Sequence, residues 1–172
     1  MEPQYLEQYQ RVKRWLSRLE AKDGLPLESN EDKTEYEDVL LAFFQNCWHL
    51  KDWIRNDVGV PEGIRDNVEG DIKAYENIMI CADMANATKH LRLDTEPRAG
   101  AARRIDCTVF LSSPFKRKEA APSHTSGVLY KYLISVEGGT VINKKGVYEP
   151  IDVARESVRE WEVYLKAKGL LT

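Results

Sequence analysis

An almost uninterrupted apolar segment near the middle of the chain limits the possible folds more than any other feature. Between Ile78 and Ala87, only Asp83 and Asn86 are polar. A helix that is apolar on nearly every side has to be enclosed by other elements, because a surface helix keeps one polar face. The segment therefore predicts a central helix over residues 78–93, surrounded by the rest of the chain.

The polar residues of this segment fall on one face of the predicted helix. At about 100° per residue, Asp83, Asn86 and His90 share a narrow stripe. Four apolar residues continue that stripe toward the N-terminus: Val68, Ile72, Tyr75 and Met79. A histidine beside a buried carboxylate or amide suits acid–base chemistry near neutral pH. Two interpretations stay open, a hydrogen-bonded network that fixes the helix end and an active site with Asp83, Asn86 and His90 as catalytic residues.

Further segments on both sides of the central one have the spacing of apolar residues that is typical of helices. Residues 3–22 and about 30–56 carry apolar residues at alternating intervals of three and four, which predicts two amphipathic helices. Residues 64–68 add a short helical turn. The last helix begins at Pro150 and ends before Gly169, a pattern typical of helix boundaries.

The hydrophobic period changes to alternation after residue 104, which predicts three antiparallel strands over residues 105–112, 128–136 and 140–144. We therefore expect an α+β fold: a helical bundle of three main helices, a small three-stranded antiparallel meander and a C-terminal helix. Residues 1–93 would form the bundle. Residues 94–172 would form the meander and last helix, packed on the bundle as one compact unit.

Charge and cysteine content restrict the classes of partner and compartment. The 25 Lys and Arg against 28 Asp and Glu give a net charge of -3, so any nucleic-acid contact has to come from a local patch. The three cysteines are widely separated, typical of buried free thiols in a reducing cytosol. No apolar run approaches the roughly 18 residues of a membrane span, and the first residues lack signal-peptide features. We expect a soluble cytoplasmic protein with no membrane contact.

A second polar group occurs in the segment Trp48-His49-Leu50-Lys51-Asp52-Trp53. His49 and Asp52 are three residues apart and could act together, although both lie nearly opposite the apolar seam of their helix. With Trp53 they form a candidate surface for a protein partner or a homodimer, because tryptophan often anchors interfaces. The alternative is an ordinary solvent-exposed histidine with an acidic neighbour.

Metal and nucleic-acid sites have weaker support. Asp83 and His90 are about 10 Å apart along a helix, so a single ion would need His49 or Asp52 from another helix. We therefore expect no cofactor, and no phosphate-binding loop or nucleophile elbow is present. The candidate nucleic-acid-binding residues, with RNA as their ligand, are Lys89, Arg92, Lys116, Arg117 and Lys118. Such a basic run is equally typical of a solvated loop.

The run Ala85-Asn86-Ala87-Thr88-Lys89-His90 resembles the active-site motif of HEPN-domain proteins, compact helical bundles found among bacterial toxins and phage-defence ribonucleases. That motif has an Arg followed by a polar residue, a short spacer and a His. Asn86 and His90 match it, whereas Ala85 occupies the Arg position. The resemblance covers at most residues 1–93. It implies metal-independent RNA cleavage, commonly at a dimer interface, with the His as acid or base and the Arg supporting phosphate charge.

Loss of the Arg removes the group that would stabilise charge on a phosphate, and Lys89 or Arg92 could take its place. The sequence thus leaves it open whether the chain is an enzyme. The leading hypothesis is a non-catalytic HEPN-like interaction or scaffold module in bacterial stress or phage defence. The alternatives are a ribonuclease that uses His90 and Asn86, with Asp83 orienting the His, and a small-ligand or metal-binding bundle that uses Asp83, His90 and His49.

Overall fold

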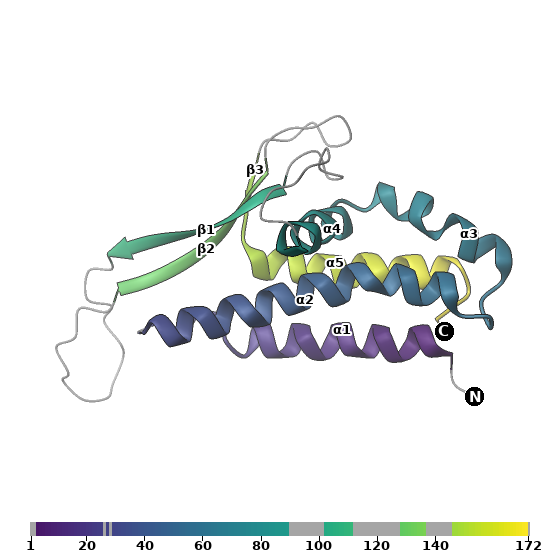
Figure 1. The fold of residues 1–172 in the computed structure, drawn as a ribbon, viewed down its shortest axis with the longest axis horizontal. Helices are drawn as coiled ribbons and strands as arrows, with labels where there is room; N and C mark the ends of the chain where they lie inside the picture. Colours follow the sequence, from purple (N-terminus) through teal and green to yellow (C-terminus); the bar gives the residue numbers. More distant parts are fainter. Residues whose placement is uncertain are drawn as a thin grey trace.

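The computed structural model describes residues 3–25, 27, 29–89, 102–111, 128–136 and 146–171. Most of this part is helical. The helices are α1 (Gln4–Glu20), α2 (Asn30–Asn56), α3 (Glu62–Asp71), the short 3-10 helix η1 (Ile72–Ala74), α4 (Glu76–Lys89) and α5 (Pro150–Ala167). In Figure 1, α1, α2 and α5 run along the length of the molecule, and α4 packs against α2 and α5.

The α+β class is wrong, because the described part of the chain is mostly helical and has five α-helices instead of three main helices and a terminal one. The strands β1 (Ala102–Leu111), β2 (Val128–Val136) and β3 (Gly146–Tyr148) pair antiparallel in that order. Figure 1 shows β1 and β2 extending away from the helices, and Ile134 of β2 is buried in the core of the helical bundle. Alternating residues can indicate strand pairing, but they do not tell where the strands pack. The predicted third strand, residues 140–144, lies outside the described residues.

Helix α2 forms the long axis of the bundle and begins with a capping box. The Oγ of Ser29 accepts a hydrogen bond from the backbone N–H of Asp32 (3.0 Å), whose carboxylate accepts one from the N–H of Ser29 (2.8 Å). The spacing of apolar residues over about residues 30–56 predicts that they face the core. This is confirmed for six of them that are buried: Tyr36, Leu40, Phe43, Cys47, Leu50 and Ile54.

Helix α4 is enclosed, as its composition predicts. All eight residues from Ile78 to Ala85 are buried, including Asp83. The start of the helix differs from the prediction, however. Helix α3 ends at Asp71, η1 follows, and Tyr75 is extended (φ -105, ψ 105) before α4 begins at Glu76. Val68 and Ile72 therefore belong to other helices and do not continue the stripe that contains Asp83.

Polar contacts at one end of the bundle join the start of α1 to the end of α2 and to the segment after α5. The buried carboxylate of Asp57 accepts hydrogen bonds from the backbone N–H groups of Tyr5 (3.2 Å) and Gly59 (2.9 Å). The hydroxyl of Tyr5 donates to the carbonyl oxygen of Leu170 (2.7 Å). One carboxylate thus holds the start of α1 against the turn between α2 and α3.

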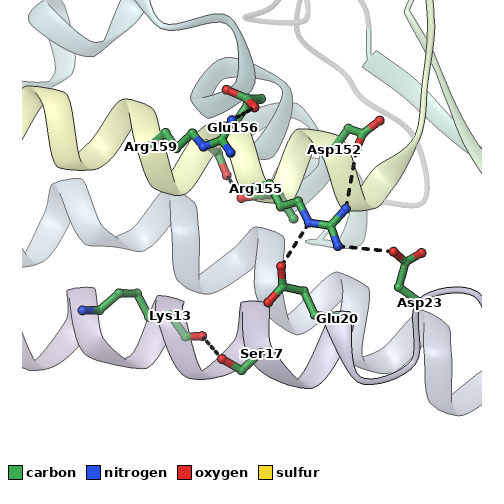
Figure 2. A network of polar contacts seen from close by, with 10 residues as sticks. Lys13, Ser17, Glu20, Asp23, Asp152, Arg155, Glu156 and Arg159 are labelled. Atoms are coloured by element: carbon green, nitrogen blue, oxygen red, sulfur yellow. Dashed lines mark hydrogen bonds and ion pairs between the residues drawn. The ribbon is translucent and has the colours of Figure 1, made fainter.

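Helix α5 closes the bundle beside α1. Its start at Pro150 and its end before Gly169 agree with the prediction, and its apolar side is buried: Ile151, Ala154, Val158, Trp161 and Leu165. Figure 2 shows Arg155 between the carboxylates of Glu20 (3.0 Å) and Asp23 (3.4 Å) at the end of α1, with Asp152 of its own helix at 3.8 Å. These side chains are more than a third exposed, so water and salt weaken the pairs and apolar packing provides most of the attachment.

Candidate functional site

The beginning of α4 is organised by a side chain from α5. The Glu160 carboxylate accepts hydrogen bonds from the backbone N–H of Ile78 (2.9 Å) and from the backbone and side-chain N–H groups of Asn77 (3.3 and 2.7 Å). Burial raises the pKa of Glu160, while these hydrogen bonds lower it by a smaller amount. Beside it, the hydroxyl of Tyr148 donates to Glu76 (2.6 Å), and this bond raises the pKa of Tyr148 to about 12.

The predicted catalytic residues differ in their access to solvent. Asp83 is 1% exposed and Asn86 is half-buried. His90 lies outside the described residues, so the structure does not place it relative to the other two. A substrate in solution cannot reach the Asp83 carboxylate in this fold. Asp83 is therefore suited to a structural role within the bundle, and Asn86 is the accessible member of the pair.

The position that carries the family's Arg is also buried. Ala85, next to Asn86 in the motif, is 1% exposed and lies in the hydrophobic core. A guanidinium at this point would have to enter an apolar environment without a carboxylate partner from the motif, which is costly. The position at which the motif lacks its Arg is therefore a core position of α4.

The cysteines on α2 and α4 are buried free thiols. Burial raises the pKa of Cys81, and the nearby thiol of Cys47 raises it further. A thiol held in its neutral form is a poor nucleophile and a poor metal ligand. Among the residues that the structure describes, no three His, Cys, Asp or Glu side chains lie close enough to hold a metal ion.

In the predicted pair of His49 and Asp52, the acidic member binds a lysine of the same helix. Asp52 binds Lys51, whose Nζ lies 2.5 Å from the Asp52 carboxylate and 4.0 Å from that of Glu69 on α3. Lys51 also lies over the ring of Trp48 at 4.6 Å. His49 is half-buried. The Asp52 carboxylate thus balances a nearly buried ammonium group.

Trp53, by contrast, lies at a surface between two helices. Its half-buried ring is covered by the guanidinium of Arg11 on α1, 5.3 Å from the ring centroid. Arg11 donates to Glu7 and to Gln8 (2.9 Å each). Gln8 in turn donates to the backbone carbonyl of Asn46 on α2 (2.9 Å). This network holds the indole and the guanidinium in a fixed arrangement on the α1–α2 surface.

Sequence reasoning missed Lys51, Glu160 and Arg11. Lys51 lies within the segment singled out for His49 and Asp52, and its position three residues after buried Trp48 is the available signal. Glu160 adjoins the seam residue Trp161, but no local pattern joins it to a helix start more than 80 residues earlier. The Arg11–Trp53 contact likewise depends on the packing of α1 against α2.

The candidate nucleic-acid-binding residues lie almost entirely beyond what the structure describes. Lys89 is the last residue of α4, and nothing is described of its side chain. Arg92, Lys116, Arg117 and Lys118 lie in the ranges outside the described residues. These residues stay predictions from the sequence.

Comparison with protein-family models, curated proteins and solved structures gives no significant match to this chain. None of the helices in the described ranges is both long and apolar enough to span a membrane.

Proposed function

We propose that this protein is a non-catalytic, HEPN-like helical interaction module that binds a protein partner through the α1–α2 surface around Trp53. The observation that carries this proposal is the half-buried Trp53 ring with the Arg11 guanidinium over it at 5.3 Å. Tryptophan and arginine are the residues that most often dominate binding energy at protein interfaces. Here they occur together at the surface of a rigid bundle.

The surroundings of Trp53 favour binding with little rearrangement. The Gln8–Asn46 hydrogen bonds (2.9 and 3.2 Å) fix α1 against α2, and Arg11 is held by Glu7 and Gln8. A side chain ordered before binding loses less conformational entropy when the partner arrives. A partner would therefore meet a surface that already has its bound shape.

The burial of α4 favours an interaction role over a ribonuclease. Asp83, expected to orient the histidine, is sealed in the core, and Ala85 is buried at the place of the phosphate-stabilising Arg. Cleavage of RNA without a metal needs a group that supports charge on the phosphate. The described part of the motif supplies no such group.

Comparative capture tests this proposal. The full chain, Trp53→Ala and the control Val163→Ala, an exposed apolar residue on α5, are immobilised in equal amounts and exposed to extract from the source cells. We expect the wild type and Val163→Ala to retain one protein in stoichiometric amount and Trp53→Ala to lose it. Arg11→Glu provides a second variant that leaves the core unchanged, and circular dichroism verifies that each variant is folded.

A ribonuclease assay tests the catalytic alternative. The folded wild type is incubated with RNA in the presence of a chelator, and the length of the RNA is followed. The proposal expects intact RNA. Cleavage that is abolished by His90→Ala and unaffected by Lys116→Ala would establish the catalytic alternative and contradict a non-catalytic module.

A further inference from the structure

We infer that the flank of α1 formed by Arg11, Arg14, Trp15 and Arg18, termed the arginine face, binds an acidic amphipathic helix of a partner protein. This inference rests on the proposed function and specifies the chemistry of the partner. It concerns residues that the sequence did not mark as a site, since the residues expected to contact a partner were His49, Asp52 and Trp53 of α2. Four observations support it.

The first observation is the spacing of the cations. Residues 11, 14 and 18 follow each other at intervals of three and four, so their side chains align along one side of α1. At about 100° per residue, the four residues of the arginine face fall within about 100° of the helix circumference. The first and last arginines are about 10 Å apart along the axis. A second helix with carboxylates at the same intervals would present one acid to each cation.

The second observation is that two of these cations are unmatched. Arg14 and Arg18 are exposed, and within the described part of the chain no carboxylate pairs with either. Arg11 already binds Glu7 at 2.9 Å. On the opposite flank of α1, Glu20 pairs with Arg155 of α5. The two exposed arginines of α1 without a carboxylate partner in the described part of the chain therefore both lie on the arginine face.

The third observation is aromatic support beneath the guanidinium groups. Arg18 lies 4.5 Å from the ring centroid of half-buried Trp15, and Arg11 lies 5.3 Å from that of Trp53. Stacking on an indole holds a guanidinium flat and leaves its in-plane donors for a carboxylate, which it binds in bidentate geometry. The exposed edges of the rings offer apolar contact to the aliphatic residues of an amphipathic helix.

The fourth observation favours a short acidic helix over a nucleic acid. The Lys22–Glu35 ion pair (2.8 Å) places the beginning of α2 beside the end of α1, where Glu37 and Asp38 are exposed. A nucleic acid has a charge at every nucleotide, so exposed carboxylates near the end of α1 repel it over a longer stretch than they repel a short helix. One face of each supporting indole is also covered by an arginine, which hinders the base stacking that single strands use. A helix with two or three spaced carboxylates carries less negative charge and does not depend on base stacking.

Binding of a designed probe tests this inference. The probe is a synthetic helix of about 20 residues with glutamates at positions i, i+3 and i+7 and leucines on the adjoining face. Its controls are the same peptide with lysines in place of the glutamates and a single-stranded uridine oligomer. Fluorescence anisotropy with the full-length protein measures affinity at low and high salt. One variant combines Arg14→Glu with Arg18→Glu. The control is Arg159→Glu, which changes an exposed side chain on α5.

We expect the acidic peptide to bind, the lysine peptide to bind at least about tenfold more weakly, and salt to reduce the affinity of the acidic peptide. The double variant should lose about tenfold or more in affinity, while Arg159→Glu should not. Equal binding by the lysine peptide, tighter binding of the uridine oligomer, no binding of the acidic peptide, or an unaffected double variant would each overturn the inference. If the capture that depends on Trp53 persists in the double variant, the proposed function stands and only this inference fails.

Discussion

Glu160 of α5 accepts a hydrogen bond from the backbone N–H of Ile78 at 2.9 Å, across 82 positions of sequence. The first turn of α4 has no acceptors from its own helix for its N–H groups, and Glu160 supplies them from outside. The positive end of the helix dipole also favours a carboxylate at this point. The last helix of the chain thus orders the start of the buried one.

Glu160→Gln should change how stability depends on pH. The pKa of Glu160 is raised above its ordinary value of 4.5 because burial penalises the charged form. Because the folded state binds this proton more tightly than the unfolded state, the proton stabilises the fold below pH 4.5. That stabilisation is lost as the pH rises through the folded-state pKa. Relative to Glu160→Gln, the wild type should therefore lose free energy of unfolding between about pH 4 and about pH 7. Urea unfolding at both pH values measures this, with exposed Glu156→Gln as control. A wild type that gains stability over this interval relative to Glu160→Gln would contradict the assignment.

Asp57→Ala should destabilise the protein by about 2 kcal/mol, because two backbone N–H groups lose their acceptor. Those groups belong to Tyr5 and Gly59 and are bound at 3.2 and 2.9 Å. Asp57→Asn keeps one acceptor oxygen and should cost less. Chemical denaturation compares both with Asp66→Ala, an exposed residue of α3. Equal stabilities of Asp57→Ala and Asp66→Ala would show that the bonds to Asp57 contribute nothing measurable.

Alkaline pH should unfold the protein through its buried tyrosines. The pKa values of Tyr36 and Tyr148 are raised from 10.0 to about 12, by burial for Tyr36 and by the bond to Glu76 for Tyr148. The unfolded chain ionises at the lower value, so stability is present below pH 10 and is lost as pH rises toward 12. Tyrosinate absorbance and circular dichroism should report delayed ionisation that coincides with unfolding. Tyr148→Phe should make the loss of stability less steep, and an unchanged slope would exclude the Tyr148–Glu76 bond as a contributor.

The helices could be predicted because their determinants are local. Ser29 and Pro150 mark helix starts, and the apolar spacing of α2 and α5 identifies the residues that are buried. The break before α4 could not be predicted, because it depends on the Glu160 carboxylate arriving from a distant helix. The prediction of an α+β class was wrong for a related reason. Alternation indicates extended backbone, but whether strands cover a core depends on contacts that are distant in sequence.

The candidate site shows the same limit. The polar stripe of α4 was found from helical geometry, which places Asp83 on a face but does not tell whether that face opens to solvent. Burial of Asp83 and Ala85 depends on the enclosing helices. Similarly, His49 and Asp52 have the spacing of a pair, whereas the group that binds the Asp52 carboxylate at 2.5 Å is the nearly buried ammonium group of Lys51. Spacing identifies neighbours on one helix, and tertiary packing decides which of them interact.

Ala85→Arg tests most directly whether the motif on α4 belongs to the core or to an active site. If the position is core, the new guanidinium is buried without a partner, and we expect a loss of roughly 4 kcal/mol or failure to fold. Ala167→Arg, at an exposed position of α5, controls for the substitution itself and should keep wild-type stability. Thermal unfolding followed by circular dichroism measures both. An Ala85→Arg protein as stable as Ala167→Arg that also cleaves RNA would contradict the account and establish an active site on α4.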